Sequence, residues 1–417
     1  MAPTKGETLV IGGGIIGLAC AFFLHRQGRA VRVIHAVGLD ESTSCGNAGG
    51  IAAAEVLPLS GPGVLLNTPK WLIDPLGPLS IRTAHIPRLL PWFWRFIGAC
   101  TVEKRRYLAQ AMATLLGTAL ADHEAVLDAT RLSHLVAKKG ALFVYKSRSG
   151  RHASQPDWDL RRDCGVQFEP LERAGLLEFE PALGPLAACG YRTEDWAHYR
   201  DPAELVVELA AYLKAAGVQF EQAEVDEMRC QEGNARGVKL TTGRIIDADH
   251  IVVAAGAWSA RLSRQLGDPV SLESERGYNT TLAQPHIEVR SFVTFSEDYF
   301  VMTPMRMGLR IGGAVEFAGL QAPPNYNRAR ALLRLAKTYL PDLHTEGGSE
   351  WMGHRPSTPD SVPVISPAQH YSNVFYAFGH GHLGLTGSMT TGRLIADLVA
   401  GVPVDVDLSP FHIKRFS

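Results

Sequence analysis

Near its N-terminus the chain reads TLVIGGGIIG over residues 8–17. The four leading residues are typical of a buried parallel strand, and the glycines after them lead into a helical pattern that ends at Gln27 and Gly28. Residues 30–34 predict a second strand, so the first part of the chain forms one β-α-β unit. This order of elements predicts an α/β protein that contains a Rossmann-like nucleotide-binding domain.

The glycines Gly12, Gly14 and Gly17 match the pattern G-x-G-x-x-G between a strand and a helix. Glycines let the main chain approach a pyrophosphate, and the helix N-terminus supplies unpaired N–H groups and the positive end of the helix dipole. Glycine-rich turns also arise for steric reasons alone, but both flanking elements are present here and favour a bound dinucleotide. The motif does not distinguish FAD from NAD or NADP.

The residue that would bind the adenosine ribose is not obvious from the sequence. An acidic residue is expected at the end of the second strand, and His35 stands there instead. The missing acid is compatible with NADP, whose phosphate prefers basic partners. Alternatively, Asp40, Glu41 or a nearby serine contacts the ribose.

The composition is that of an ordinary globular enzyme. Hydrophobic residues make up 46% and charged residues 20% of the 417, which is enough chain for two domains. The net charge of −1 argues against a nucleic-acid partner. The six cysteines lack zinc-like spacing and predict reduced thiols without a metal site. No apolar run reaches about 18 residues, so we expect a cytoplasmic protein, with peripheral contact at the inner membrane face as the alternative.

Further along the chain, the patterns predict a second domain. Prolines make residues 57–91 look irregular, residues 103–130 carry a helical pattern, and residues 147–160 predict an exposed polar turn. Residues 271–315 contain alternating runs typical of antiparallel strands. The expected layout is a discontinuous FAD-binding domain, 1–60 with 195–270 and 350–417, interrupted by a mostly antiparallel α+β substrate-binding domain, 61–194 with 271–349.

Later motifs resemble one enzyme family. Residues 43–50 (TSCGNAGG) resemble a T-S-x-x-N-A-G loop, and residues 351–360 (WMGHRPSTPD) resemble a W-x-G-x-R-P-x-T-P-D segment. Residues 62–82, 252–259 and 310–317 add to the resemblance. Over nearly its whole length the chain is similar to D-amino-acid dehydrogenases of the DadA type (small subunit), within the superfamily of D-amino-acid oxidase, glycine oxidase and sarcosine oxidase.

The resemblance implies that the dinucleotide is FAD, held non-covalently in a domain of the glutathione-reductase type. A covalent link to a C-terminal thiol is disfavoured because no cysteine follows Cys230. The glycine loop and the resemblance together predict a set of FAD-binding residues. These are Gly12, Gly14, Ile15, Ile16, Gly17, His35, Ser44, Asn47, Ala48, Gly49, Gly50, Val225, Ala254, Ala255, Gly256, Trp258, Gly379, His382, Leu383, Gly384, Leu385 and Thr386.

Arg355 is the residue that the resemblance places on the substrate carboxylate. A guanidinium presents paired donors to a planar carboxylate, although an interdomain ion pair is the alternative role. Tyr278 and Tyr299 lie on predicted strands of the substrate domain, where each either contacts the substrate or packs in the core.

The turn at residues 379–387 is expected to bring backbone N–H groups against the pyrimidine end of the flavin, where they stabilise negative charge. His382 in this turn stands where glycine oxidase carries a second arginine, so we include it among the substrate-site residues. His380 and His382 are unsuited to hold a metal because no carboxylate or cysteine accompanies them.

These inferences predict the oxidative deamination of a small amino acid, with a D-amino acid favoured. Hydride passes from the α-carbon to flavin N5, and the imino acid hydrolyses to a keto acid and ammonia. Alternatives are another amine substrate (glycine, sarcosine, a β-amino acid or a hydroxyproline-type imino acid), a nicotinamide-dependent dehydrogenase, and a non-catalytic FAD-binding subunit. The electron acceptor, oxygen or quinone, and the oligomeric state stay open. Residues 92–96 (WFWRF) predict core packing, with a shallow membrane contact as the alternative.

Overall fold

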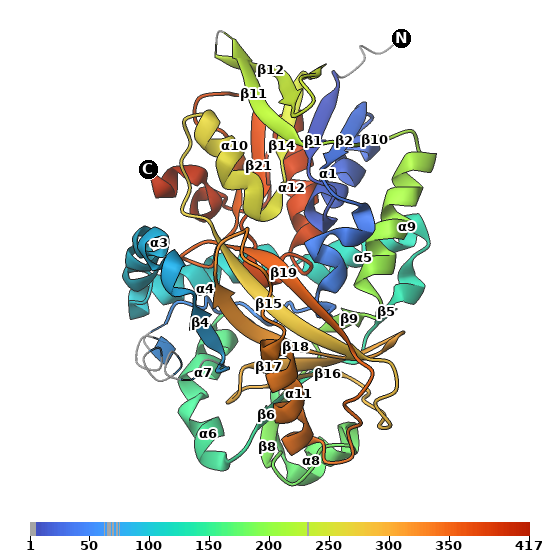
Figure 1. Ribbon diagram of the computed structural model, residues 1–417, viewed down its shortest axis with the longest axis vertical. Helices are drawn as coiled ribbons and strands as arrows, with labels where there is room; N and C mark the ends of the chain where they lie inside the picture. The colour runs from blue at the N-terminus through green and yellow to red at the C-terminus, as the bar shows by residue number, and fades with distance from the viewer. Residues whose placement is uncertain are drawn as a thin grey trace.

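The computed structural model describes residues 6–61, 63, 64, 68, 71, 74, 76–231 and 233–417. Part of the resembling stretch at 62–82, including Lys70 and Pro75, lies outside the described residues. The upper half of Figure 1 contains a six-stranded sheet in the order β10-β2-β1-β14-β21-β20. Its strands are β1 (Thr8–Ile11), β2 (Val31–His35), β10 (Gln219–Gln222), β14 (His250–Val253), β20 (Val364–Pro367) and β21 (Val374–Phe378).

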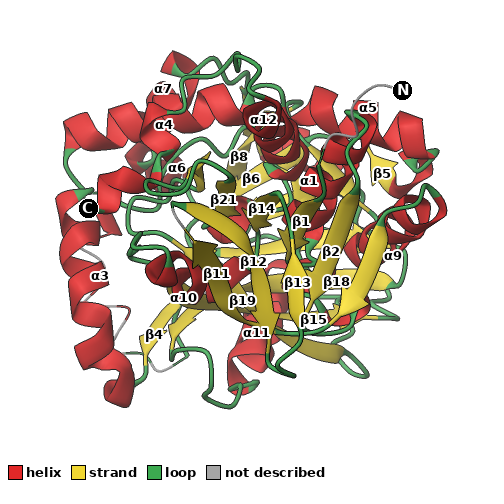
Figure 2. Ribbon diagram, turned by 90° about the horizontal axis from the view of Figure 1, so that it is seen from above, coloured by secondary structure: helices red, strands yellow, loops and turns green. Residues whose placement is uncertain are grey.

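All neighbouring strands of this sheet are parallel except the edge pair β20 and β21. Alternate residues of each strand point to opposite faces. Val10 and Val252 face helices α1 (Ile15–Arg26) and α12 (Ser388–Ala400), whereas Leu9 and Ile251 face a second apolar cluster. Figure 2 shows the two helices together on one side of the sheet. The predicted Rossmann-like fold is confirmed.

The second apolar cluster lies between the parallel sheet and a small antiparallel sheet. That sheet consists of β11 (Val225–Gln231), β12 (Asn234–Leu240) and β13 (Ile245–Asp247). Helix α10 (Ser259–Gln265) packs beside it. Helix α9 (Pro202–Ala215) lies on the opposite face, next to α1. Helix α9 begins after Asp201, whose carboxylate caps it by accepting from the N–H groups of Ala203 and Glu204.

A larger mixed sheet forms the lower half of the molecule (Figure 1) and confirms the antiparallel runs expected over 271–315. Its order within the described residues is β19-β15-β18-β17-β16-β6-β8-β7, and β4 pairs with β18. Helix α11 (Asn327–Tyr339) covers one face. The strands are β4 (Leu79–Ile81), β6 (Ala141–Tyr145), β7 (Glu169–Glu172), β8 (Cys189–Thr193), β15 (Glu273–Leu282), β16 (Phe292–Phe295), β17 (Phe300–Met305), β18 (Gly308–Phe317) and β19 (Ser349–Ser357).

The two sheets draw on separated segments of the chain, in line with the discontinuous domains we propose at 1–60, 195–270 and 350–417, and at 61–194 and 271–349. Strand β19 falls almost wholly in the third of these segments, yet it pairs with β15 in the larger sheet. The polypeptide therefore crosses between the sheets close to residue 357, where the substrate site is expected.

Two expectations about local structure were wrong. Helix α3 (Ile86–Gly98) begins inside the stretch expected to be irregular, because Pro87 occupies its first turn, where a missing N–H costs nothing. Helices α6 (Arg148–Ala153) and α7 (Gln155–Asp163) replace the polar turn expected at 147–160. Ser147 caps α6 through its hydroxyl.

The helical pattern at 103–130 forms two helices, α4 (Val102–Leu116) and α5 (Ala119–Thr130), with Gly117 between them. Both lie near the boundary between the two halves of the molecule in Figure 1. Within the described part of the chain, no helix combines the length and the apolar character that a membrane crossing needs.

Candidate active site

A cavity of about 990 Å³ runs between the parallel sheet and the larger mixed sheet. It is lined by the glycine loop, the loop at 43–50, the strands β15, β18 and β19, and the turn at 380–386. All the residues predicted to bind FAD or substrate line it, apart from Gly17, Gly49 and Gly379. The fold therefore brings most of the predicted site residues into one cavity, although they are scattered over 370 positions of the sequence.

The glycine loop forms one end of the cavity. Gly12 has a φ of +126°, and a β-carbon there would collide with the carbonyl oxygen of Ala254, directly after the neighbouring strand β14. Gly14 caps α1 without any side-chain hydrogen bond. The Ile15 N–H donates to Ser44 Oγ at 3.0 Å, and the rest of the helix N-terminus faces the cavity. An open helix N-terminus behind a glycine turn fits the pyrophosphate of FAD.

The loop at 43–50 is anchored by the larger sheet. Asn279 Nδ2 donates to the carbonyl oxygen of Gly46 at 2.8 Å, and Arg310 Nη1 donates to that of Asn47 at 2.5 Å. Burial lowers the pKa of Arg310 from its ordinary value. The sequence did not identify these two anchors as functional, because each lies more than 230 positions from the loop.

At the adenosine end of the cavity, the structure distinguishes between the acids considered for the ribose. His35 contacts the Val37 carbonyl oxygen through Nδ1 at 2.8 Å. Glu41 lines the cavity and accepts the Gly38 N–H at 3.1 Å, whereas Asp40 does not line it. Of the two acids, only Glu41 therefore faces the cavity.

The turn at 380–386 is held from behind by a buried histidine of α5. His123 Nε2 lies 3.0 Å from the carbonyl oxygens of both Leu385 and Thr386, so this nitrogen carries the proton and donates. Its Nδ1 then accepts from the Tyr199 hydroxyl at 2.7 Å. Burial lowers the pKa of His123 to about 4, and the ring is neutral at physiological pH.

The two histidines in the turn are also uncharged. Burial lowers the pKa of His380 to about 3, and burial likewise lowers that of His382. His380 Nε2 is 2.9 Å from Thr391 Oγ1. No cluster of three or more potential metal ligands occurs among the described residues.

Arg355 projects from β19 into the cavity, directly opposite Glu275 on β15. Its Nη1 donates to Glu275 Oε1 at 3.0 Å and to the carbonyl oxygen of Ala314 at 3.3 Å. Among the described residues, Nε and Nη2 have no hydrogen-bond partner, so this edge of the guanidinium is available to a carboxylate. Ser357 Oγ donates to the second oxygen of Glu275 at 2.9 Å.

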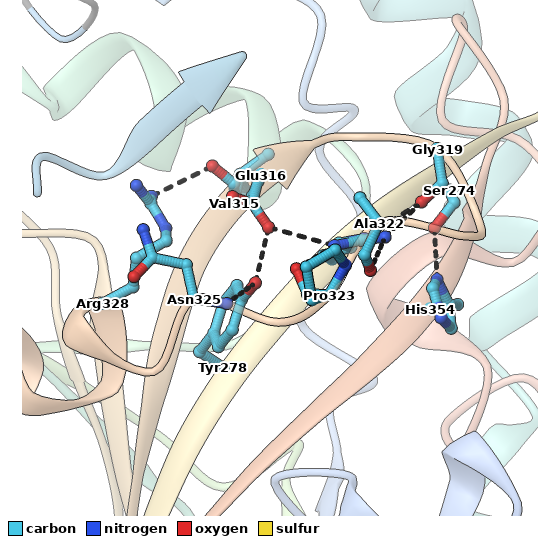
Figure 3. A network of polar contacts seen from close by, with 11 residues as sticks. Ser274, Tyr278, Val315, Glu316, Gly319, Ala322, Pro323, Asn325, Arg328 and His354 are labelled. Atoms are coloured by element: carbon cyan, nitrogen blue, oxygen red, sulfur yellow. Dashed lines mark hydrogen bonds and ion pairs between the residues drawn. The ribbon is translucent and has the colours of Figure 1, made fainter. Parts of the chain in front are cut away.

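The two tyrosines have different environments. Tyr278 contributes to the cavity wall, but its side chain lies in the apolar cluster beneath α11, where its hydroxyl donates to Glu316 at 2.5 Å and accepts the Asn325 N–H (Figure 3). This position matches the core-packing role that the sequence left open for Tyr278. Because its hydroxyl already makes these two hydrogen bonds, it is not available to a substrate. Tyr299 is 49% exposed, and its ring meets that of Trp71 edge-to-face at 5.0 Å. The Trp71–Tyr299 pair lines the cavity.

A second arm of the cavity is apolar and reaches towards α3. Trp92 anchors α3 to the site, since its Nε1 donates to the carbonyl oxygen of Ser357 at 3.0 Å. The arm is lined by Leu79, Ile81, Leu89, Trp92, Phe93, Phe96, Val315 and Phe317. The sequence predicted packing for residues 92–96, and Trp92 and Phe96 are buried there.

Residues 7–398 match the model of a protein family described as "FAD dependent oxidoreductase" (DAO). The chain belongs to the DAO family. This member is 35% identical to a D-amino-acid oxidase of Bradyrhizobium diazoefficiens, over 99% of this chain and 100% of that protein. It is 31% identical to a D-amino acid dehydrogenase of Methylobacterium nodulans, over 95% of both chains.

Solved structures support the fold of this DAO-family protein. Glycine oxidase from Bacillus cereus superposes with a TM-score of 0.71 at 20% identity, over 95% of both chains. L-proline dehydrogenase from P. horikoshii superposes with a TM-score of 0.76 at 18% identity, over 100% of this chain and 98% of that one.

Family membership confirms three predictions. The protein is an enzyme of the amino-acid oxidase and dehydrogenase family, its cofactor is FAD and not a nicotinamide, and its reaction needs an amino-acid substrate and an electron acceptor. The glycine loop and the open N-terminus of α1 fit that cofactor.

Proposed function

We propose that this enzyme oxidatively deaminates a D-amino acid whose carboxylate is bound by Arg355. The observation that carries the proposal is the Nε–Nη2 edge of Arg355, which has no hydrogen-bond partner among the described residues and lies inside the cavity that also contains the glycine loop. The names of the curated relatives, a D-amino-acid oxidase and a D-amino acid dehydrogenase, favour this substrate class.

The chain's own residues contribute binding and orientation. The two free donors of Arg355 fix a planar carboxylate in one orientation, which presents the α-carbon in a constant position. The neutral His380 and His382 add no positive charge that would compete for the carboxylate. Bound FAD supplies the hydride acceptor, and the amine must be uncharged when the hydride leaves. No side chain is assigned as a base.

For the cofactor, we propose that the residues predicted from the sequence that line the cavity contact FAD. The N-terminus of α1 takes the pyrophosphate, Glu41 takes the adenosine ribose, and the main chain of residues 382–386 takes the pyrimidine end of the flavin. Gly17, Gly49 and Gly379 do not line the cavity, so we assign them to the shape of the backbone.

The carboxylate role is tested by replacing Arg355 with alanine and with lysine. Losing a charge-assisted bidentate contact costs about 2–3 kcal/mol, so KM for the amino acid should rise on the order of 30- to 150-fold in the alanine variant. The lysine variant keeps the charge and should recover part of the loss. FAD content should stay at the wild-type level. An unchanged KM in both variants would refute the role of Arg355.

We further propose that helix α3 binds the enzyme peripherally to an anionic lipid surface, from which a quinone acceptor is reached. Ile86, Leu90 and Trp94 recur every fourth residue, so they form one stripe, and they are 43%, 48% and 69% exposed. Residues 81–102 contain no aspartate or glutamate. An amphipathic helix with exposed arginines and a tryptophan is typical of interfacial binding.

The opposite face of α3 supports this proposal. Leu89, Trp92 and Phe96 line the apolar arm of the cavity, so α3 itself lies between the exposed stripe and the site. Co-sedimentation with vesicles that contain anionic lipid should recover the wild-type enzyme and release it at high salt. The variant Leu90→Ser/Trp94→Ser should stay in the supernatant with full dye-linked activity. Equal sedimentation of both proteins would rule out the α3 contact.

A further inference from the structure

The proposed carboxylate-binding arginine already has a buried acid as its neighbour. Glu275 and Arg355 are opposite each other in the antiparallel pair β15–β19, and their charged atoms are 3.0 Å apart. The Glu275 side chain is 4% exposed, whereas that of Arg355 is 26% exposed. The carboxylate is thus sealed behind the guanidinium, and the guanidinium faces the cavity.

The contacts of Arg355 divide its guanidinium into two edges. Nη1 is used by Glu275 and by the carbonyl oxygen of Ala314, while Nε and Nη2 have no partner in the described part of the protein. Ala314 has a φ of +57°, an unusual conformation for a residue with a side chain, and such strain gathers at functional sites. One edge is fixed by the protein, and the other is left for a ligand.

We propose that Glu275 is the internal counter-ion of Arg355, a positioning residue with two separable effects on ligand binding. It holds the guanidinium in the orientation that a carboxylate needs, and its negative charge weakens the attraction so that a product acid can leave. The inference rests on the proposed role of Arg355. Neither the sequence motif nor the family match assigns Glu275 a role.

The two effects predict opposite changes in two variants. Glu275→Ala removes the partner of Nη1, so the guanidinium loses its orientation and carboxylates bind more weakly. Glu275→Gln keeps an oxygen that accepts from Nη1 and an amide that donates to Ser357 Oγ, but it removes the negative charge. A bound carboxylate is then no longer repelled across a site sheltered from water, and it binds more tightly.

Benzoate is a suitable probe because it has a carboxylate and no oxidisable amine. Its Kd is measured on the FAD-loaded enzyme by the change in the flavin spectrum. We expect the Kd to fall on the order of tenfold in Glu275→Gln and to rise on the order of tenfold in Glu275→Ala. KM for the amino acid should move in the same directions, while FAD content and melting temperature confirm that the Gln variant is folded.

Two results would overturn the inference: Kd values within twofold of wild type in Glu275→Gln, or an equal weakening in both variants, which would indicate structural support alone. If Glu275→Ala fails to fold, Ser357→Ala takes its place. The Ser357→Ala change frees one oxygen of Glu275 and should weaken the binding of benzoate only mildly. Arg355→Ala separates the two proposals. If it retains wild-type benzoate affinity, the proposed function fails; if it loses that affinity while the Glu275 variants do not change, only the role of Glu275 fails.

Discussion

At the scale of single residues, Gly277 decides how the arginine lies. A β-carbon on Gly277 would fall 2.7 Å from Arg355 Nε and closer still to its Cζ and Nη2. Gly277→Ala should therefore displace the guanidinium and raise KM for the amino acid by at least about tenfold, with FAD content unchanged. Gly98→Ala is the matched control, because nothing lies near its added carbon. A Gly277→Ala enzyme with wild-type KM would contradict this placement.

Glu41 and Asp40 offer a matched pair for the ribose contact. Glu41 lines the cavity and Asp40 does not. Losing a hydrogen bond between a carboxylate and a ribose hydroxyl costs about 1.5–3 kcal/mol, so Glu41→Ala, which removes the acceptor, should raise the Kd of FAD by roughly 10-fold or more. Asp40→Ala should leave it unchanged. The Kd is measured by the recovery of flavin fluorescence on dilution, and equal effects in both variants would exclude this role for Glu41.

A site residue can be predicted from the sequence when the pattern that identifies it lies within one contiguous segment. Arg355 lies within a contiguous motif, and the resemblance identified it as a site residue. Glu275 is 80 positions away and joins Arg355 only through the pairing of β15 with β19, so no local pattern could reveal it. For Tyr278 the sequence leaves substrate contact and core packing open, since a tyrosine on a strand can point to either face of the sheet, and this one points to α11.

At the scale of elements, α5 supports the turn at 380–386 through one side chain. His123 makes hydrogen bonds to Tyr199, Leu385 and Thr386. His123→Ala leaves these buried partners unsatisfied, so it should lower the free energy of unfolding by about 2–4 kcal/mol and raise the Kd of FAD. Tyr199→Phe removes one of the bonds and should cost about 1 kcal/mol. Urea unfolding measures the free energy of unfolding, and FAD titration measures the Kd. A His123→Ala variant that loses no more stability than Tyr199→Phe would refute this supporting role of His123.

The elements that the sequence missed share a physical cause. Prolines made 57–91 look irregular, yet Pro87 is compatible with the first turn of α3, and packing of Trp92 and Phe96 stabilises that helix despite Pro91. Polar residues at 147–160 suggested a turn because their periodicity was weak. By contrast, the first β-α-β unit was predicted correctly because strand, glycine turn and helix follow one another without interruption.

At the scale of the whole molecule, buried neutral histidines make stability depend on pH. Burial lowers the pKa of His123, His198 and His354 to about 4 and that of His380 to about 3. The unfolded chain binds these protons near pH 6.5, whereas the folded chain does not. Stability is therefore complete above about pH 6.5 and falls as the pH drops towards 4.

Thermal melting of the FAD-loaded enzyme between pH 7.5 and pH 4.5 should show this decline. Each histidine contributes up to about 1.4 kcal/mol per pH unit in that window. His354→Gln removes one of these titrating groups and should make the decline shallower. His412→Gln is the comparison variant, because His412 is only partly buried. A melting temperature that stays constant down to pH 5 would contradict the account.

The proposed reaction is the transfer of hydride from a D-amino acid to FAD in the cavity that contains Arg355. Anaerobic mixing of the FAD-loaded enzyme with matched D- and L-amino acids, glycine, sarcosine and proline tests this directly, through flavin absorbance at about 450 nm. We expect bleaching by at least one D-amino acid and not by its L-enantiomer, with a far higher concentration needed in Arg355→Ala. Bleaching by L-amino acids alone, or by none of the panel, would contradict it.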